Sequence, residues 1–424
     1  MLTINQIREN SSFIINRLKV KNFNSEEIIA KIIQLDSERR EIQTKTDSLQ
    51  NEMNNVSKTI GTLMQQGKKD EAESQKQKTY SLKEEIRTLI DKVYPIETEL
   101  KNEIVKLPNL PHESVPAGKS ADDNFIVRQG GTMPVISEEA LPHWELIKKY
   151  NIIDFDLGVK ITGAGFPVYF GKGARLQRAL INFFLDEGIK AGYKEVMPPI
   201  VVNEDSGFGT GNLPDKEGQM YYAQLDGFYL IPTAEVPVTN IYRDVILNSE
   251  TLPVRNVAYT PCFRREAGSW GAHVRGLNRL HQFDKVEIVQ IAHPDNSYQS
   301  LEEMVKHVEN LVLQLGLPYR IVKLCGGDMS FTSALTYDFE VWSAAQKRWL
   351  EVSSVSNFES FQANRLKCRF KEKGDKQTKL AHTLNGSALA LPRIVAAIIE
   401  NNQTDNGIKI PPVLVPYTGF DIID

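Results

Sequence analysis

The chain has 424 residues, of which 41% are hydrophobic and 25% are charged, so it is long enough for two ordinary globular domains. It has no apolar run of the roughly 20 residues that a membrane-spanning helix needs, and residues 1–8 lack the pattern of a secretory signal, so we expect no membrane contact. The net charge of −4 argues against indiscriminate binding of polyanions, so contact with RNA would need local basic patches. Cys262, Cys325 and Cys368 have no metal-ligand spacing, which predicts reduced thiols in the cytoplasm and no zinc site.

The first quarter of the chain carries apolar residues at seven-residue intervals. The first stripe consists of Ile28, Leu35, Ile42, Leu49, Val56 and Leu63. The second stripe consists of Leu82, Ile86, Leu89, Val93, Ile96 and Leu100. Gly67 lies between the stripes in a short polar segment. Two heptad-patterned helices joined by a glycine-containing turn predict an antiparallel coiled-coil arm.

Charged residues fill the positions between the two stripes. A solvated surface is the simpler interpretation for most of them, and a surface that binds RNA is the alternative. The sequence leaves both interpretations open. The basic residues that would contact RNA in the second case are Arg39, Arg40, Lys76 and Lys78, with Lys68, Lys69 and Lys83 beside them.

A proline-rich segment at residues 107–118 has the composition of a linker. We therefore expect an N-terminal domain with the helical arm at residues 1–115 and a second domain at residues 116–424. The second domain contains a helix with one apolar face near residues 176–184, followed by strand-like runs without a regular βαβ rhythm. This pattern predicts an α+β fold, with an antiparallel sheet flanked by helices. The runs expected to form strands are 228–235, 256–265, 282–291, 348–355 and 365–373.

Polar residues are densest in two neighbouring strand-like runs. The period of a strand places Arg264 and Glu266 on one face, and it does the same for Phe283, Lys285 and Glu287. Burying such charges is costly unless they serve a ligand or pair with each other. A guanidinium grips carboxylate or phosphate, and an aromatic ring stacks on a base. The whole set predicts a site for an anionic, base-bearing ligand, with a salt-bridge ladder as the alternative for any single pair.

These runs resemble the motifs of a known family. Residues 264–287 resemble motif 2 of class II aminoacyl-tRNA synthetases, residues 163–199 resemble motif 1, and residues 383–393 resemble motif 3. Residues 233–235 and 351–357, together with the two-helix arm, narrow the resemblance to seryl-tRNA synthetases of the bacterial type. The resemblance extends over essentially the whole chain.

The resemblance implies a serine–tRNA ligase. Such an enzyme activates L-serine with ATP, accompanied by Mg²⁺, to give seryl-adenylate and pyrophosphate. It then transfers the seryl group to tRNA(Ser), and we expect tRNA(Sec) to be charged as well. Motif 1 implies a homodimer. The serine carboxylate is already ionised, so the first step needs alignment and charge neutralisation rather than a general base.

The resemblance also implies roles for individual residues. Arg264 would bridge the serine carboxylate and the α-phosphate, and Arg393 would hold the outer phosphates, which makes these two the catalytic candidates. The candidates for binding serine are Thr233, Ala234 and Glu235 near the ammonium group, and Glu287, Asn385 and Ser387 near the hydroxyl group. The candidates for binding ATP are Arg264, Arg265, Glu266, Phe283, Glu351, Val352, Ser353, Ser354 and Arg393.

Glu351 and Ser354 are the expected ligands of Mg²⁺, since oxygen ligands suit this hard cation. Simple alternation places them on opposite faces of a strand, so the sequence requires a bulge or a strand end there. In contrast, the same alternation puts Thr233 and Glu235 on one face of their expected strand.

The chain departs from the usual family pattern at a few positions, none of which carries a reacting group. These positions are Arg265, Ala272, His273, Asn364, Ala388 and Pro392. They leave open how the motif 2 loop grips the end of tRNA. A related enzyme that loads a carrier other than tRNA is one alternative, which the arm disfavours. A non-catalytic RNA-binding protein is another, which is disfavoured by the joint retention of Arg264, Glu266, Phe283, Glu287, Glu351 and Arg393.

Overall fold

The computed structural model describes residues 1–215, 217–266 and 274–424, which divide into two compact units. One unit contains Met1–Lys19 and Phe23–Pro108, and the other contains Val20–Asn22 and Asn109–Asp424. Within these described ranges, no helix has the length and apolar character to cross a membrane.

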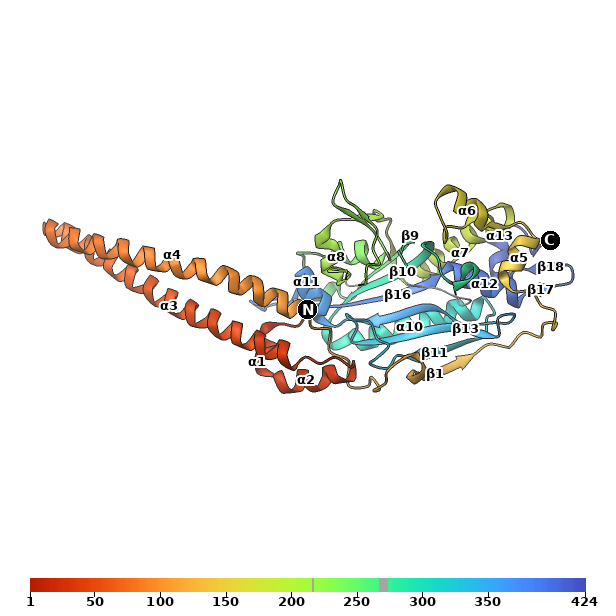
Figure 1. The fold of residues 1–424 in the computed structure, drawn as a ribbon, viewed down its shortest axis with the longest axis horizontal. Coiled ribbons are helices and arrows are strands. Elements are labelled where there is room, and N and C mark those ends of the chain that lie inside the picture. Colours follow the sequence, from red (N-terminus) through yellow and green to blue (C-terminus); the bar gives the residue numbers. More distant parts are fainter. Residues whose placement is uncertain (216, 267–273) are drawn as a thin grey trace. The chain divides into compact units, whose positions relative to one another are not determined.

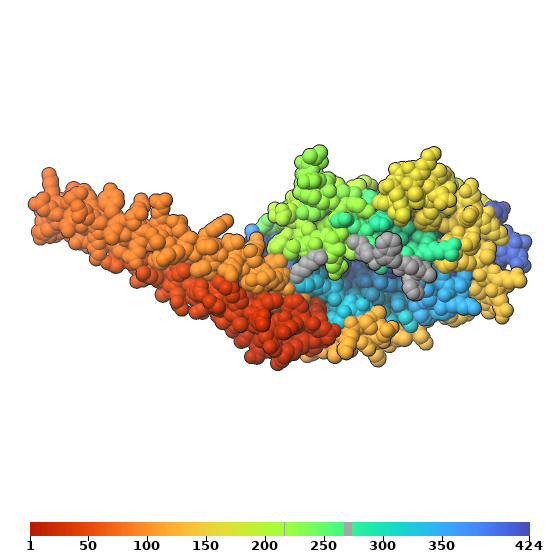
Figure 2. Space-filling model, in the orientation of Figure 1, coloured from red at the N-terminus to blue at the C-terminus, as the bar shows by residue number. Residues whose placement is uncertain are grey.

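The first unit is a helical arm. Short helices α1 (Ile4–Glu9) and α2 (Ser11–Val20) precede the long helices α3 (Glu26–Gln65) and α4 (Lys69–Val105), which pack against each other (Figures 1 and 2). Every apolar position of the two heptad stripes is buried or half-buried. Gly67 makes the turn with a φ of +75°, a value that a residue without a Cβ adopts readily. The predicted antiparallel coiled coil is confirmed.

Ion pairs between α3 and α4 agree with one antiparallel register. Lys31 pairs with Glu99 at 3.0 Å, and Lys45 pairs with Glu85 at 3.0 Å. Further out, Lys78 pairs with Glu52 at 2.7 Å. These pairs are half-exposed, so each contributes little to stability, but all three match the same alignment of the two apolar stripes.

The second unit is built on a large sheet, which has eight strands among the described residues. In spatial order the strands are β1 (Phe125–Gly130), β11 (Tyr319–Lys323), β12 (Leu335–Ser343), β13 (Arg348–Asn357), β16 (His382–Ala390), β10 (Gln282–Ala292), β9 (Val254–Phe263) and β4 (Lys194–Glu195). Neighbouring strands are antiparallel, apart from the described pair of β4 and β9. The predicted α+β fold on an antiparallel sheet is confirmed.

One face of this sheet carries the main hydrophobic core. Helices α7 (Gly171–Lys190), α10 (Ser297–Gln314) and α12 (Leu391–Asn401) pack there, and α10 and α12 lie along the sheet in Figure 1. Val286 and Ile288 of β10 point into this core. The alternate residue Val289 packs instead with α9 (Glu235–Asn240). Strand alternation therefore directs Lys285 and Glu287 away from the main core, toward α9.

The remaining elements form short connections and small sheets around this framework. The helices are η1 (Ala121–Asp123), α5 (His143–Lys149), α6 (Phe155–Ile161), α8 (Glu204–Thr210), η2 (Ser249–Thr251), η4 (Gly276–Asn278), η5 (Pro294–Asn296), α11 (Ser360–Leu366), η6 (Pro412–Leu414) and α13 (Val415–Thr418). The strands are β2 (Ile153–Asp154), β3 (Val168–Tyr169), β5 (Val201–Val202), β6 (Tyr222–Ala223), β7 (Phe228–Leu230), β8 (Ile246–Asn248), β14 (Arg369–Lys371), β15 (Lys379–Leu380), β17 (Gln403–Thr404), β18 (Gly407–Lys409) and β19 (Ile422–Ile423).

Three of the expected strands are wrong in part, and one of them, 256–265, ends at Phe263. The run 228–235 forms a strand only as far as Leu230, and α9 begins at Glu235. Thr233 Oγ1 accepts from the backbone N–H of Glu235 at 3.2 Å, and Pro237 lies in the first turn, where a missing N–H costs nothing. The run 365–373 divides between α11 and β14, so Arg365 is helical.

Candidate active site

The polar face of β10 meets β16 and the start of α9. Glu287 and Ser387 are direct partners across the β10–β16 pair. Lys285 Nζ donates to Thr233 Oγ1 at 2.8 Å and forms an ion pair with Glu287. Thr233, Lys285, Glu287 and Ser387 are all buried. Two strands and a helix start therefore bring together residues that lie up to 154 positions apart.

Asn385 joins the two carboxylates of this cluster. Its Nδ2 donates to Glu235 Oε2 at 2.8 Å and to Glu287 Oε1 at 3.0 Å. Ser387 Oγ lies 3.5 Å from Glu287 Oε2, at the limit of a hydrogen bond. The candidates Thr233, Glu235, Glu287, Asn385 and Ser387 thus lie in one connected cluster. Ala234 differs from them, because its side chain packs into the apolar contact between α9 and the sheet.

Glu235 of this cluster has a raised pKa. Burial, reinforced by the neighbouring Glu287 carboxylate, raises the pKa of Glu235 to about 7. Gln362 of α11 donates to Glu235 Oε1 at 2.6 Å and to the carbonyl of Thr210 at 3.0 Å. Sequence reasoning missed Gln362, because no motif surrounds it. Lys285 was expected on the polar face but was assigned no role, although its alternation with Glu287 indicated that the two side chains lie side by side.

Arg264 and Phe283 form the next part of the site. The Arg264 guanidinium lies over the Phe283 ring at 5.2 Å, and its Nε approaches the carbonyl of Pro232 at 3.4 Å. The expected strand face shared by Arg264 and Glu266 is wrong, because β9 ends at Phe263 and Glu266 has a φ of +48°. Glu266 instead forms an ion pair with Arg279.

Arg393 and the ATP candidates of β13 lie close together. Arg393 Nη1 donates to the carbonyl of Glu351 at 2.7 Å and lies 3.7 Å from its carboxylate. The register of β13 against β12 shifts between Glu351 and Ser353, which confirms the bulge that the sequence required there. Val352 points into the main core, and Ser353 Oγ donates to the carbonyl of Ser387 at 2.6 Å. Glu351 and Ser354 remain accessible.

Asp338 is a further carboxylate of this region that sequence reasoning missed. It is the register partner of Ser354 on the neighbouring strand β12. Burial, followed by the nearby Glu351 carboxylate, raises the pKa of Asp338 well above its ordinary range. Within the described ranges, Asp338 Oδ1 has no hydrogen-bond partner. An uncompensated buried carboxylate oxygen beside a second carboxylate is the arrangement that a cation would relieve.

Two positions that depart from the family pattern, Ala388 and Pro392, have ordinary structural explanations. Ala388 is buried in the main core. Pro392 lies in the first turn of α12, where a missing N–H is tolerated. The backbone N–H of Arg265 donates to the carbonyl of Gln219 at 2.8 Å. Ala272 and His273 lie outside the described residues.

Among the arm candidates for RNA contact, Arg39, Lys76 and Lys78 pair with carboxylates. Arg39 donates to the buried Asp36 at 2.8 Å. Lys76 pairs with Glu73 at 2.8 Å and Lys78 with Glu52 at 2.7 Å, and both lysines are about half exposed. Arg40 is exposed as well. Exposed ion pairs in water are weak, so these lysines can exchange a carboxylate for a phosphate at small cost.

Known proteins resemble both units of the chain. Residues 1–111 match the seryl-tRNA synthetase N-terminal domain, and residues 222–402 match the tRNA synthetase class II core domain (G, H, P, S and T). A serine–tRNA ligase of Salinibacter ruber is 49% identical over 99% of this chain and 98% of its own length. One of Gloeothece citriformis is 44% identical over 100% of this chain and 99% of its own length.

A solved structure agrees with these relatives. The seryl-tRNA synthetase from Pyrococcus horikoshii complexed with ATP has a TM-score of 0.94 and 32% identity, covering 100% of this chain and 99% of that one. The cytoplasmic serine–tRNA ligase from Naegleria fowleri in complex with AMP has a TM-score of 0.88 and 25% identity, covering 100% of this chain and 99% of that one. The chain therefore belongs to the seryl-tRNA synthetase family, with a class II catalytic core.

Proposed function

We propose that this protein is a serine–tRNA ligase that activates L-serine with ATP and transfers it to tRNA(Ser). The observation that carries this proposal is the buried cluster of Glu235, Glu287, Asn385 and Ser387 beside Arg264 and Phe283. Relatives that match the whole chain are named for this activity. The same resemblance supports tRNA(Sec) as a second substrate.

Serine fits the cluster in one orientation. Its ammonium group would lie against Glu235 and Thr233, and its hydroxyl group would lie between Glu287 and Ser387. Glu287 and Ser387 are 1% and 7% exposed, so their polar atoms need a partner when water is excluded. The serine carboxylate would then extend toward Arg264, whose fork of donors can hold the carboxylate and the α-phosphate together.

Adenylate formation in this site depends on placement and charge. The ionised serine carboxylate attacks the α-phosphate of ATP, and pyrophosphate leaves, so no side chain needs to accept a proton. Arg264 would neutralise charge at the reacting phosphate, and Arg393 would hold the departing phosphates. Phe283 would stack on the adenine ring. Glu266 would contact the adenine amine only after its ion pair with Arg279 has opened.

The residues present fit a magnesium ion bound with ATP. Glu351 and Ser354 would hold it, and Asp338 Oδ1, which has no hydrogen-bond partner within the part of the chain that the structure describes, belongs to the strand next to them. Within the same ranges, no group of three or more His, Cys, Asp and Glu side chains could hold a metal ion. Oxygen ligands from ATP must therefore complete the shell, which is usual for magnesium, and the bound ion would neutralise phosphate charge.

Serine binding should weaken as pH falls below about 7. An ammonium group binds the ionised form of Glu235, whose pKa lies at about 7 in the empty site, so protons compete with serine at lower pH. We expect affinity to fall by up to about tenfold per pH unit below that point. Calorimetric titration of serine at several pH values measures this slope. Glu235→Gln should bind serine weakly without this slope, and a flat wild-type profile would contradict the assignment.

The site should discriminate strongly between serine and alanine. A pocket that hydrogen-bonds a hydroxyl group loses that hydrogen bond when alanine binds and leaves polar atoms of Glu287 and Ser387 against a methyl group, so kcat/KM for alanine should be lower by about 10⁴-fold. Pyrophosphate exchange with each amino acid measures the ratio. Ser387→Ala should reduce the ratio by weakening serine alone. An alanine rate within tenfold of the serine rate would exclude this pair as the hydroxyl reader.

We further propose that residues 1–115 bind tRNA and residues 116–424 carry catalysis, in a homodimer. Large apolar side chains are exposed on the second unit near the motif 1 segment, including Ile161 at 71% and Met197 at 90%. Others are Val159 and Phe170. Exposed apolar surface of this extent marks an interface.

The oligomeric state can be checked directly. Light scattering after size exclusion should give about twice the chain mass of 47.9 kDa at micromolar concentration. A single species at the chain mass would contradict the dimer.

Aminoacylation with labelled serine tests the proposed function itself. The full chain, ATP, magnesium and a tRNA(Ser) transcript should give labelled tRNA, and omission of ATP should abolish it. Adenylate formation without charged tRNA would favour an enzyme that loads another carrier. Absence of serine-dependent exchange would reject the proposal.

A further inference from the structure

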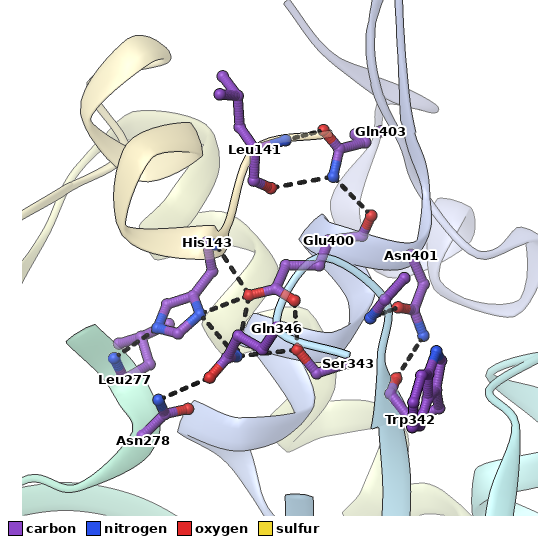
Figure 3. A network of polar contacts seen from close by, with 11 residues as sticks. Leu141, His143, Leu277, Asn278, Trp342, Ser343, Gln346, Glu400, Asn401 and Gln403 are labelled. Atoms are coloured by element: carbon purple, nitrogen blue, oxygen red, sulfur yellow. Dashed lines mark hydrogen bonds and ion pairs between the residues drawn. The ribbon is translucent and has the colours of Figure 1, made fainter. Parts of the chain in front are cut away.

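A buried polar network lies behind the site, between α5, η4, α12 and the β12–β13 turn (Figure 3). We propose that His143 and Glu400 are positioning residues for Arg393, and that they act through the backbone at Leu277 and Asn278. This inference rests on the proposed function, because Arg393 is the residue assigned to the outer phosphates of ATP.

Glu400 is the anchor of the network and is fully buried. Its Oε1 accepts from the His143 backbone N–H at 2.9 Å, from His143 Nδ1 at 2.7 Å and from Gln346 Nε2 at 3.0 Å. Its Oε2 accepts from Ser343 Oγ. Burial raises the pKa of Glu400, but the hydrogen bonds from His143 and Ser343 outweigh it, so the pKa lies below its ordinary value and the carboxylate is ionised.

His143 connects Glu400 to the motif 2 segment at Leu277. Its Nε2 lies 2.9 Å from the backbone N–H of Leu277, which can only donate, so Nε2 must be the acceptor. Nδ1 then carries the hydrogen and donates to Glu400, which fixes the neutral tautomer (Figure 3). The contact is close, since a Cβ at Gly276 would lie 2.3 Å from Nε2. A side chain at position 276 would lift this segment off the imidazole.

A second route from Glu400 reaches the next residue, Asn278. Gln346 donates to Glu400 and its Oε1 accepts from Asn278 Nδ2 at 2.9 Å (Figure 3). The carbonyl of Asn278 in turn accepts from Arg393 Nε at 2.9 Å. Both routes therefore end on adjacent residues, and one of these residues orients the Arg393 guanidinium. Among the residues that the structure describes, no hydrogen bond of this network reaches the cluster assigned to serine.

Helix α12 carries both Arg393 and Glu400. Arg393 and Glu400 lie seven residues apart on it, about two helical turns, and so share one face of the helix. The helix holds Arg393 from its backbone, and the network holds the guanidinium from the η4 side. A purely structural role for the buried pair is the competing explanation, because a buried carboxylate needs partners wherever it lies.

Two substitutions of His143 separate these explanations. Gln can place Oε1 near the position of Nε2 and accept from Leu277, but it loses the donor to Glu400. Asn can place Nδ2 near the position of Nδ1 and donate to Glu400, but it loses the acceptor for Leu277. If His143 positions Arg393, ATP affinity should fall in the order wild type, His143→Gln, His143→Asn. If the pair only satisfies Glu400, His143→Gln should be the worse variant.

Calorimetric titration of the full chain with ATP and, separately, with serine gives the readout. We expect His143→Asn to weaken ATP binding about tenfold and to leave serine binding within about twofold of wild type. In the Arg393→Ala background, the same substitution should cause no further loss, since its effect passes through the missing guanidinium. Equal weakening of ATP and serine, the reversed order, or additivity with Arg393→Ala would overturn the inference.

Gln346→Ala covers the case in which the His143 variants do not fold. Gln346 is half-buried in a turn, so its loss should leave the fold intact while breaking the second route. ATP binding should weaken about threefold with serine binding unchanged, and unchanged ATP binding would overturn the inference. A wild-type protein without serine-dependent exchange would instead reject the proposed function, which keeps the two failures distinct.

Discussion

Arg264→Ala is expected to reduce serine-dependent adenylate formation by about 10²- to 10³-fold, the usual cost of removing a donor that stabilises developing charge. Arg264 lies just past the end of β9 and is oriented by the Phe283 ring at 5.2 Å and the carbonyl of Pro232 at 3.4 Å. Alanine removes both the charge and the fork of donors. Single-turnover formation of adenylate, with serine and ATP saturating, measures the loss in the chemical step.

Two further variants test whether the loss of rate is specific to the Arg264 guanidinium. Arg264→Lys keeps the charge but loses bidentate geometry, so it should recover only part of the rate. Arg255→Ala removes a guanidinium from β9 itself, where Arg255 pairs with Glu303 at 2.6 Å on the α10 side. It should leave adenylate formation within a few-fold of wild type. An Arg264→Ala rate equal to that of Arg255→Ala would remove Arg264 from the reaction.

Shortening the arm should abolish most charging of tRNA while leaving serine activation intact. Lys45 and Glu85 face each other at 3.0 Å, so residues 46–84 can be deleted and the helices closed by a short glycine-rich turn there. The apolar stripes below the cut keep their register. We expect charging to fall by about 10²-fold or more, because binding energy supplied far from the reacting atoms is lost. Pyrophosphate exchange should stay within about twofold of wild type, since the serine and ATP candidates lie after residue 232.

Removing positive charges from the arm is a milder change than shortening it. Combined replacement of Arg40, Lys76 and Lys78 by alanine should weaken tRNA binding and flatten its dependence on salt, because fewer counterions are released. Replacing Glu52 and Glu73, the partners of the two lysines, should do the opposite or nothing. Normal charging by the shortened protein would show that the arm does not read tRNA and that its charges are a solvated surface.

Sequence alone predicted the parts of the fold whose pattern repeats. The heptad stripes predicted α3 and α4, and residues such as Leu35 and Leu89 are buried as expected. The alternation of Lys285 and Glu287 predicted a shared polar face, and the spacing of Glu351 and Ser354 required the bulge that β13 contains. Local periodicity determines which side of an element faces the core, so these expectations depended only on residues close in sequence.

The failures lie where short segments and distant contacts decide the outcome. Residues 233–235 turn into a helix because the Thr233 hydroxyl accepts from the Glu235 backbone N–H, a local hydrogen bond that competes with the strand preference of the following valines. Gln362 reaches Glu235 across 127 positions, and His143 reaches Glu400 across 257 positions. No periodic signal links residues so far apart. Such contacts follow from the sheet order, which the sequence pattern left open.

A crystal structure with a non-hydrolysable seryl-adenylate analogue would show directly how the proposed pocket holds serine. We expect the serine hydroxyl within hydrogen-bond distance of Glu287 and Ser387, and the ammonium group against Glu235. We also expect the acyl-phosphate linkage on Arg264, with the adenine on Phe283. An analogue bound with its hydroxyl group away from Glu287 and Ser387, or bound outside this cluster, would contradict the assignment of the serine pocket.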